Sequence, residues 1–275
     1  MLVPTPLGNL GDMTPRAIAA LRSADLALCE DTRVTARLCA VWGITTRLSP
    51  LHDYNEDSRI AFVLALLRQG KRVALLSDAG TPLVSDPGFR LVRAAIEAGL
   101  PVGALPGPNA AVLALVLSGL PPHPFVFMGF APPKSAGRRA AFSRLRAAER
   151  AGLSATQIWY EAPHRLAETL ADAALVFGDR PAAVAREMTK RFEEVRRDTL
   201  PALAAHYAEQ AARGEICLVI GPAPEEATAE ADLDGLLRAA LATASLKAAV
   251  AQVTAATGLP RKQVYARALA VQAAS

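Results

Sequence analysis

Apolar residues in the first 120 positions follow two alternating spacings, one typical of helices and the other of short buried strands. The spacing predicts strands over residues 25–30, 72–77 and 102–105, and helices from Pro15 and over residues 32–42, 56–69, 89–98 and 109–118. Thr14 can cap the first helix, and Gly43 and Gly70 can end the second and third. Because helices that alternate with buried strands are typical of βαβ units, this half is expected to form a mainly parallel sheet.

Three prolines interrupt the chain just after residue 120. The segment Leu120 to Pro124 cannot continue a helix, because proline fixes φ and removes an amide donor, so we place a domain boundary there. Beyond it, apolar runs predict strands over residues 125–130, 156–161, 182–187, 194–199 and 216–220. With helices between several of these strands, the second half is expected to be a mixed α/β domain.

A Pro/Glu/Ala-rich linker over residues 222–231 precedes three short helical patterns at 233–242, 246–256 and 261–273. The predicted organisation is an N-terminal α/β domain at 1–120, a C-terminal α/β domain at 121–224 and a helical tail at 232–275. A length of 275 residues fits two domains with a small appendage.

The composition excludes several classes of protein. No apolar run approaches the roughly 20 residues of a membrane span, and the first ten residues hold two prolines and no basic stretch, so we expect a soluble, cytoplasmic protein. The three cysteines and four histidines lack the paired spacing of a zinc site or a disulfide framework, which predicts no metal. A net charge of +4 permits a polyanionic partner without requiring one.

Four loops contain residues that bend the backbone or open it to a ligand, at positions 5–12, 77–88, 106–110 and 160–165. In open α/β sheets, loops at the carboxyl ends of strands form the ligand crevice. Gly80, Gly88 and Gly107 let main chain approach a ligand, and Asp78 and Asp86 supply acceptors for hydroxyls or a positive centre. These features suit a nucleoside-containing cation; the alternative is that the loops are ordinary turns. The dinucleotide and P-loop motifs are absent, which disfavours a phosphate-binding site.

Seven strings carry a resemblance that covers nearly the whole chain: TPLGNL, CEDTR, SDAGTPLVSDPG, PGPNAA, YEAPHR, AREMTK and GEICLVIG. In this order they resemble the tetrapyrrole methylase family, and more narrowly the ribosomal RNA small subunit methyltransferase I family, which methylates a cytidine 2′-hydroxyl in the decoding region of 16S rRNA. Residues 245–269 also resemble the helix-turn-helix-like extension of that RNA enzyme. The resemblance implies a homodimer that holds S-adenosylmethionine between two α/β domains and acts on 16S rRNA within the small ribosomal subunit.

The same motifs imply which residues meet the cofactor and the RNA. At the cofactor they place Pro6, Ser77, Asp78, Ala79, Gly80, Val84, Gly107, Asn109, Ala110, Glu161 and Met188. For contacts to RNA phosphates we propose Arg33, Arg165 and Lys190, together with Arg261 and Lys262 of the tail. The alternative for the first three is that they form ion pairs with Asp31, Glu161 or Glu187. Tyr54 departs from the family pattern, in which a second histidine is common.

A ribose hydroxyl is a poor nucleophile while protonated, so a general base within hydrogen-bond reach would assist the reaction. The candidates are Glu30, Asp31, Asp86 and His52. Asp31 has an alternative role as a helix N-cap, because aspartate is strongly preferred there. Near residue 140, the helical pattern also carries a basic set whose default interpretation is a solvated surface: Arg138, Arg139, Arg144 and Arg146.

Two other functions remain open at this point. The first is a tetrapyrrole or precorrin methyltransferase that acts on a small molecule, which would lack the helical tail and carry a GDP-type loop in place of SDAGTP. The second is a non-catalytic RNA-binding protein of ribosome assembly, which would not need the complete set of cofactor loops present here.

Overall fold

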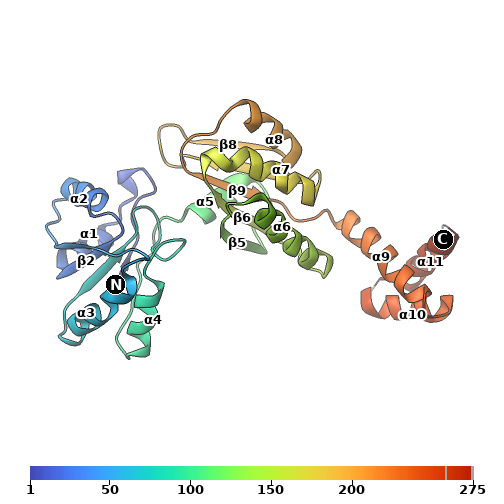
Figure 1. Ribbon diagram of the computed structural model, residues 1–275, viewed down its shortest axis with the longest axis horizontal. Helices are drawn as coiled ribbons and strands as arrows, with labels where there is room; N and C mark the ends of the chain where they lie inside the picture. The colour runs from blue at the N-terminus through green and yellow to red at the C-terminus, as the bar shows by residue number, and fades with distance from the viewer. Residues whose placement is uncertain (258, 274–275) are drawn as a thin grey trace.

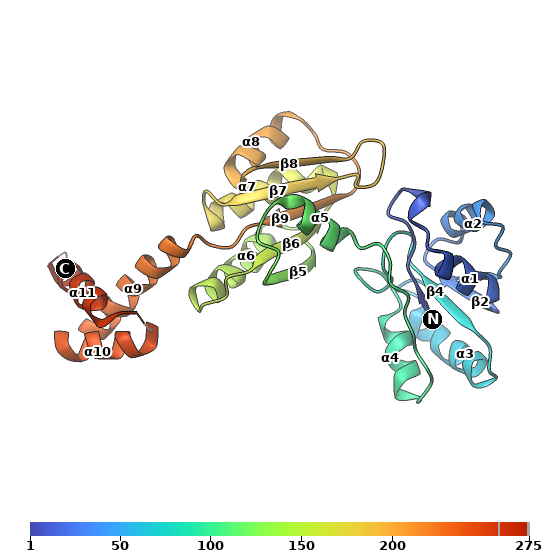
Figure 2. The same cartoon turned by 180° about the vertical axis from the view of Figure 1, so that it is seen from behind.

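The computed structural model describes residues 1–257 and 259–273, which form two lobes and a helical tail. Each lobe is built on its own β-sheet. Figure 1 shows the first lobe in blue and cyan and the second in green to orange, with the tail extending from the second lobe. Seen from behind, the tail again lies on the side of the second lobe away from the first (Figure 2).

The first sheet is parallel, as predicted. Its strands are β1 (Leu2–Val3), β2 (Leu26–Cys29), β3 (Leu48–Pro50) and β4 (Val73–Leu76), in the order β1-β4-β2-β3. Its helices are α1 (Pro15–Ser23), α2 (Thr32–Val41), α3 (Glu56–Arg68) and α4 (Phe89–Glu97), with a 3-10 turn η1 (Leu10–Asp12) before α1. Thr14 caps α1 by accepting a hydrogen bond from the Ala17 amide at 3.1 Å, which confirms the predicted start.

Alternate strand residues of this sheet face two separate cores. Ala27 and Ala74 pack with α1 and α2 on one face, whereas Leu28 and Leu75 pack with Val63 of α3 and Leu91 of α4 on the other. Because both faces are covered by helices, the central strands β2 and β4 are fully buried, and this is why they are continuous apolar runs in the sequence.

Two sequence predictions in this lobe were wrong. Residues 102–105 do not form a strand; Ala104 makes only an isolated bridge to Leu2, because β1 is two residues long and offers little to pair with. The prediction also missed β3, which lies at the sheet edge, is three residues long and ends in Pro50. Such a strand lacks the buried apolar run that signals its neighbours.

The second sheet is mixed, as predicted, and all five of its strands lie within one residue of their predicted bounds. They are β5 (Phe125–Phe130), β6 (Thr156–Glu161), β7 (Pro181–Arg186), β8 (Glu194–Thr199) and β9 (Ile216–Ile220), in the order β5-β6-β9-β7-β8. Only the β5–β6 pair is parallel. One face packs against α6 (Ser135–Arg150), α7 (Leu166–Phe177) and α8 (Leu200–Glu209), with the turn η2 (Pro163–Arg165) before α7.

Helix α5 (Ala110–Ser118) covers the other face of the second sheet. Ala111, Ala114 and Leu115 pack there against Ile158 and Val219. Sequence reasoning assigned this helix to the first domain because it precedes the prolines. Its packing instead attaches it to the second sheet, so the chain passes between the lobes just before α5.

The tail consists of α9 (Glu225–Leu241), α10 (Leu246–Thr257) and α11 (Arg261–Ala273), which share a core that includes Leu237, Val250 and Val264. The predicted linker over residues 222–231 was wrong from Glu225 onward, where the chain is helical. Alanine and glutamate are strong helix formers, and the two prolines lie before the helix begins. In the part of the chain that the structure describes, no helix is long and apolar enough to cross a membrane.

A buried ion pair ties three elements of the second lobe together. The Arg180 guanidinium donates to both carboxylate oxygens of Glu149, at 2.8 and 3.1 Å, and also to the Gly221 carbonyl at 2.9 Å. Gln157 donates to the same carboxylate at 3.2 Å. Both charged side chains are almost fully buried, so each relies on the opposite charge of the other to offset the loss of hydration.

Removing one of these charges should therefore be costly. We predict that Glu149→Gln lowers the free energy of unfolding of the second lobe by about 3–5 kcal/mol, because it leaves the Arg180 charge buried without its counter-ion. Urea denaturation followed by the fluorescence of Trp159, which is buried in the same lobe, measures the change. The control is Glu209→Gln at the exposed end of α8, which should change stability by less than about 0.5 kcal/mol. Equal effects of the two substitutions would contradict the interpretation.

Candidate active site

A cavity of about 370 Å³ lies between the lobes; we refer to it as the interlobe cavity. The first lobe contributes Leu7 and much of the loop at 78–86, and the second lobe contributes the ends of several strands and the start of α5. The lining residues are Leu7, Asp78, Ala79, Gly80, Thr81, Val84, Ser85, Asp86, Asn109, Ala110, Phe130, Tyr160, Glu161, Ala162, Pro163, Met188, Gly214, Glu215, Ile216 and Cys217. The volume is within the usual range for a small-molecule site.

The loop after β4 is held in one shape by its neighbours. The backbone amide of Thr5 donates to the Gly80 carbonyl at 2.9 Å, and the Gly80 amide donates back at 3.0 Å. Thr81 Oγ1 donates to the Pro108 carbonyl at 2.8 Å. Three chain segments that are far apart in sequence therefore form one wall of the cavity.

Unfavourable backbone conformations gather on both sides of the cavity. Leu83 and Ser85 have φ values of 71° and 68° in the first lobe, and Glu187 and Thr189 have values of 50° and 65° in the second. These are the only four non-glycine residues with positive φ among those that the structure describes. Since each such residue costs of order 1–3 kcal/mol, the surrounding contacts must fix both loops.

Most of the residues expected at the cofactor line the cavity. They are Asp78, Ala79, Gly80, Val84, Asn109, Ala110, Glu161 and Met188. Pro6, Ser77 and Gly107 are not among the lining residues. Ser77 is buried and donates to the Gly80 carbonyl at 3.0 Å, and a Cβ on Gly107 would lie 2.2 Å from Pro4 Cγ, so both shape the wall from behind.

Other lining residues were not among the predicted cofactor contacts, although they lie within the seven motif strings. Leu7 lies in TPLGNL, Tyr160 in YEAPHR, and Gly214 to Cys217 in GEICLVIG. The motif strings could therefore have found these positions. Phe130 lies in none of these strings. It reaches the cavity through a local irregularity of β5, which the sequence does not reveal.

The cavity is acidic. Glu161 and Glu215 are ion-paired with Arg165 and Lys190, whereas no ion pair among the described residues involves Asp78 or Asp86. No Lys, Arg or His is among its described lining residues. Burial raises the pKa of Asp86 to about 7, and the nearby carboxylates of Glu30 and Asp78 add to the shift. Burial also raises the pKa of Asp78 and of Glu30. A cation in the cavity would relieve this repulsion.

These residues fit S-adenosylmethionine. The carboxylates of Asp78 and Asp86 suit its positive charges, while Leu7, Val84 and Met188 offer apolar contact to its nucleoside. Among residues 1–257 and 259–273, no group of three or more His, Cys, Asp or Glu side chains could hold a metal ion.

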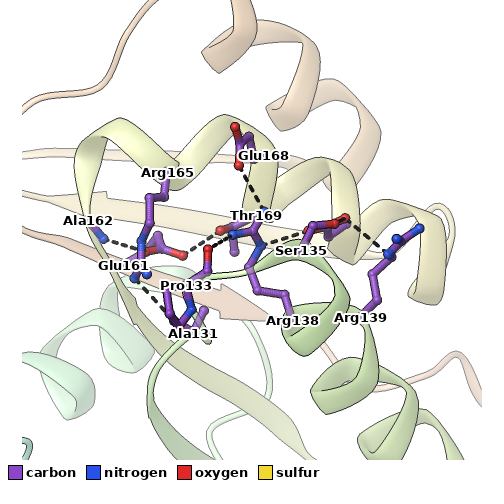
Figure 3. A network of polar contacts seen from close by, with 11 residues as sticks. Ala131, Pro133, Ser135, Arg138, Arg139, Glu161, Ala162, Arg165, Glu168 and Thr169 are labelled. Atoms are coloured by element: carbon purple, nitrogen blue, oxygen red, sulfur yellow. Dashed lines mark hydrogen bonds and ion pairs between the residues drawn. The ribbon is translucent and has the colours of Figure 1, made fainter.

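Glu161 is buried at the cavity, and both oxygens of its carboxylate accept hydrogen bonds. It accepts hydrogen bonds from the Ala162 amide at 2.7 Å, from Thr169 Oγ1 at 2.5 Å and from Arg165 Nε at 2.7 Å (Figure 3). Arg165 also donates to the Ala131 carbonyl at 3.3 Å. The ion-pair alternative for Arg165 is thus what the structure contains, and Glu161 anchors the cavity floor to α7.

The basic set on α6 is not a uniformly solvated face. Arg138 is buried and donates to Asp172 at 2.8 Å, to Glu168 at 3.1 Å and to the Pro133 carbonyl at 2.9 Å (Figure 3). The default interpretation was therefore wrong for Arg138, because acidic residues of α7 face it. Arg139 and Arg144 are exposed, and half-buried Arg146 pairs with Glu149.

A second, shallower hollow adjoins the interlobe cavity and shares Asp78 with it. Its lining residues are Glu30, Asp31, Thr32, Arg33, His52, Tyr54 and Asp78. The Asp31 amide donates to Asp78 Oδ1 at 3.2 Å, which joins the two sites. Three of the four candidate bases, Glu30, Asp31 and His52, thus lie in the second hollow, and Asp86 lies in the interlobe cavity.

Asp31 is both an N-cap and an ion-pair partner. It accepts a hydrogen bond from the Arg33 amide at 2.8 Å and pairs with the Arg33 guanidinium at 2.7 Å. These bonds lower the pKa of Asp31 to about 2. His52 Nδ1 is buried and has no hydrogen-bond partner among the described residues.

Lys190 joins the two lobes beside the cavity. Its ammonium group pairs with Glu187 at 2.8 Å and with Glu215 at 3.0 Å. Its stem lies on Gly8 of the first lobe, where an added Cβ would come within 2.3 Å of Lys190 Cγ. Of the residues proposed to contact RNA, Arg33, Arg165 and Lys190 are therefore ion-paired here, whereas Arg261 and Lys262 are exposed at the start of α11.

Known families and proteins match this chain over nearly its full length. The family described as Tetrapyrrole (Corrin/Porphyrin) Methylases matches residues 1–204, and the RsmI C-terminal HTH domain matches residues 227–272. The chain is 50% identical to Ribosomal RNA small subunit methyltransferase I of Micromonospora olivasterospora, over 96% of this chain and 84% of that protein. It is 42% identical to the protein of the same name from Escherichia coli O157:H7, over 98% and 94% of the two chains.

Solved structures agree on the fold. Uroporphyrin-III-C-methyltransferase from Thermus thermophilus superposes with a TM-score of 0.53 at 22% identity, over 80% of this chain and 92% of that one. Diphthine synthase gives a TM-score of 0.61 at 16% identity, over 80% and 88%. The chain therefore belongs to the tetrapyrrole methylase family and, within it, to the ribosomal RNA small subunit methyltransferase I group.

Proposed function

We propose that this protein transfers a methyl group from S-adenosylmethionine to the 2′-hydroxyl of a cytidine in the decoding region of 16S rRNA, within the small ribosomal subunit in the cytoplasm. Membership of its family makes the chain an S-adenosylmethionine-dependent methyltransferase. The rRNA in the names of its full-length relatives supports the substrate class. The observation that carries the proposal is the acidic interlobe cavity, in which Asp86 has a pKa near 7.

Positioning is the main requirement of this reaction. When bound, S-adenosylmethionine supplies an electrophilic methyl group on a positively charged sulfur. The 2′-hydroxyl would take this methyl group, the sulfur would leave as a neutral thioether, and the hydroxyl proton would pass to a base of the chain. Holding the reactants in line can supply roughly 7–11 kcal/mol of the barrier. The strained loops on both sides of the cavity are suited to hold them.

We assign the proton to Asp86. A base works best when its pKa is close to the pH of the reaction. The pKa of Asp86 is about 7 in the free protein, so the carboxylate remains a stronger base than that of Asp31 even when a bound cation lowers this value. Asp31 is a weaker candidate, because its contacts with Arg33 lower its pKa to about 2. Glu30 and His52 line the second hollow and are not among the residues that line the interlobe cavity.

Basic residues near both sites support an RNA partner. The Arg33 side chain is 85% exposed despite its pairing with Asp31, so a phosphate can compete for it. Arg165 would have to leave the buried carboxylate of Glu161, and Lys190 would have to leave two carboxylates, Glu187 and Glu215, so we expect both to contribute less. Arg261 and Lys262 lie at the exposed start of α11.

A homodimer is also part of the proposal. Helix α5 exposes Val112 and Val116, which are one turn apart and share a face. Exposed apolar side chains on a helix that otherwise packs into a core suit burial against a second copy of the chain.

Asp86→Asn tests the base. We predict that kcat, measured at saturating S-adenosylmethionine, falls by about 10²–10⁴-fold. The Kd for S-adenosylmethionine should also rise, because the variant lacks a carboxylate that favours the cation. In the wild type, the single-turnover rate should rise with pH through the pKa of Asp86 and then level off, because the carboxyl must lose its proton to act. That pKa should lie below 7 in the complex, since a bound cation favours the carboxylate.

The assay uses radiolabelled S-adenosylmethionine and small ribosomal subunits, followed by mapping of the methylated nucleotide. Asp179→Asn, at an exposed turn, is the control and should retain wild-type turnover. Loss of turnover in Asp31→Asn but not in Asp86→Asn would assign the base to Asp31. Label that enters only a free tetrapyrrole, or no cofactor binding, would favour one of the two alternative functions.

The tail contacts can be tested through salt dependence. Arg261→Ala/Lys262→Ala should weaken binding to small subunits and reduce the slope of log K against log salt by about 1–2, because fewer counterions are released. Filter binding at several salt concentrations measures the slope. Arg59→Ala/Arg68→Ala on α3 is the matched control. An unchanged slope in the tail variant would remove these two residues from the RNA interface.

The homodimer predicts a mass of twice the 28.9 kDa chain by light scattering. Val112→Asp/Val116→Asp should shift this mass toward that of one chain, because it places charge in the proposed interface. Leu175→Asp, exposed on α7, controls for added charge and should leave the dimer intact. A single-chain mass for the wild type would contradict the proposal.

A further inference from the structure

Phe130 at the end of β5 points to the side of the sheet opposite to the one that strand alternation predicts. Phe127 and Phe130 are three residues apart, so a regular strand would direct them to opposite faces. Yet both rings contact Tyr160 edge-on, with centroid distances of 4.9 and 5.5 Å. The reversal must occur between them.

A β-bulge at Gly129 causes the reversal. Phe127 pairs with Ile158 and Phe130 with Tyr160, so three steps along β5 match two along β6. Gly129 has a φ of 68°, which glycine adopts without a steric cost. Bulges of this kind re-aim side chains and are frequent beside active sites.

The bulge places an aromatic ring at the mouth of the interlobe cavity. Phe130 lines the cavity and is 57% exposed, so its ring is accessible to a ligand. Tyr160, half-buried on the next strand, braces its edge. Tyr160 therefore holds the Phe130 ring in place by its edge, and a face of the ring is available to a ligand.

The ring lines the same cavity as the proposed base, Asp86. A Cβ built on Gly129 would be 3.6 Å from Ser85 Oγ, and Ser85 directly precedes Asp86. Tyr160 lines the cavity as well, and burial is the main cause of the raised pKa of its hydroxyl, to which Cys217 and Asp86 add. Phe130, Tyr160 and Asp86 thus form one cluster at the boundary between the lobes.

We propose that Phe130 is a positioning residue on which the base of the target nucleotide stacks, so that its ribose hydroxyl is presented to Asp86. This inference rests on the proposed RNA function. Proteins that act on or read single RNA nucleotides stack unpaired bases on aromatic side chains. A rigid, exposed ring beside the site of proton transfer meets that need.

The test compares Phe130→Leu, Phe130→Tyr and Phe130→Trp with the wild type. Stacking on one base predicts that kcat/KM for small ribosomal subunits falls by about 5- to 100-fold in Phe130→Leu, which keeps an apolar side chain but loses the ring. The two aromatic variants should stay within about threefold of the wild type. Calorimetry without RNA should give the same Kd for S-adenosylmethionine in all four proteins. The matched control is Phe125→Leu, at the start of the same strand and outside the cavity lining.

Three results would overturn the inference, and they can be distinguished. A weaker Kd for S-adenosylmethionine in Phe130→Leu, with kcat/KM restored at saturating cofactor, would assign the ring to the cofactor. Equal kcat/KM in Phe130→Leu and the wild type would show that no base stacks on it. If the wild type itself transfers no methyl group to the subunits, the proposed function fails and the inference fails with it.

Discussion

Uncompensated negative charge in the interlobe cavity is the constraint on which the site depends. Asp78 and Asp86 line a half-buried space that no described Lys, Arg or His side chain enters, and Glu30 lies close enough to raise the pKa of Asp86. Burial of carboxylates without a counter-ion is unfavourable, so the free protein is held in a state that a cation would stabilise. The same few carboxylates thus favour a cationic cofactor and give Asp86, the proposed base, a pKa of about 7 in the free protein.

The fold maintains this state with rigid backbone. The four non-glycine residues with positive φ flank the cavity, and the loop after β4 is bonded to the first loop and to Pro108. On the opposite side, the Lys190 stem rests on Gly8 while its ammonium group holds Glu187 and Glu215. The buried pair of Arg180 and Glu149 and the bonds to Glu161 anchor the second sheet behind these loops. The contacts behind the loops therefore stabilise the fold, and the unfavourable backbone conformations lie at the edge of the cavity.

Long buried strands and helices were predicted well from the sequence. Short edge strands and contacts that depend on a neighbouring segment were predicted poorly. Fully buried strands such as β4 and β9 are apolar runs that are visible without tertiary information. The edge strand β3 and the bridge at Ala104 depend on what lies beside them, and α9 depends on helix propensity that the prolines before it obscured. The packing of α5 on the second sheet could not be read from chain order.

The same distinction holds for the site. The motif strings located the loops and eight lining residues, because glycine, proline and aspartate in a loop have few other uses. They could not rank the four candidate bases, since the pKa values of Asp31 and Asp86 diverge only through contacts made in the fold. Nor could they find Phe130, which a one-residue bulge turns toward the cavity.

The most direct test of the account is the pKa of Asp86 itself, measured by carbon-13 NMR of its carboxyl group with and without S-adenosylmethionine. The account predicts a value of about 7 in the free protein and a clearly lower value in the complex. A free value near 3.8, or a value that the cofactor leaves unchanged, would contradict it.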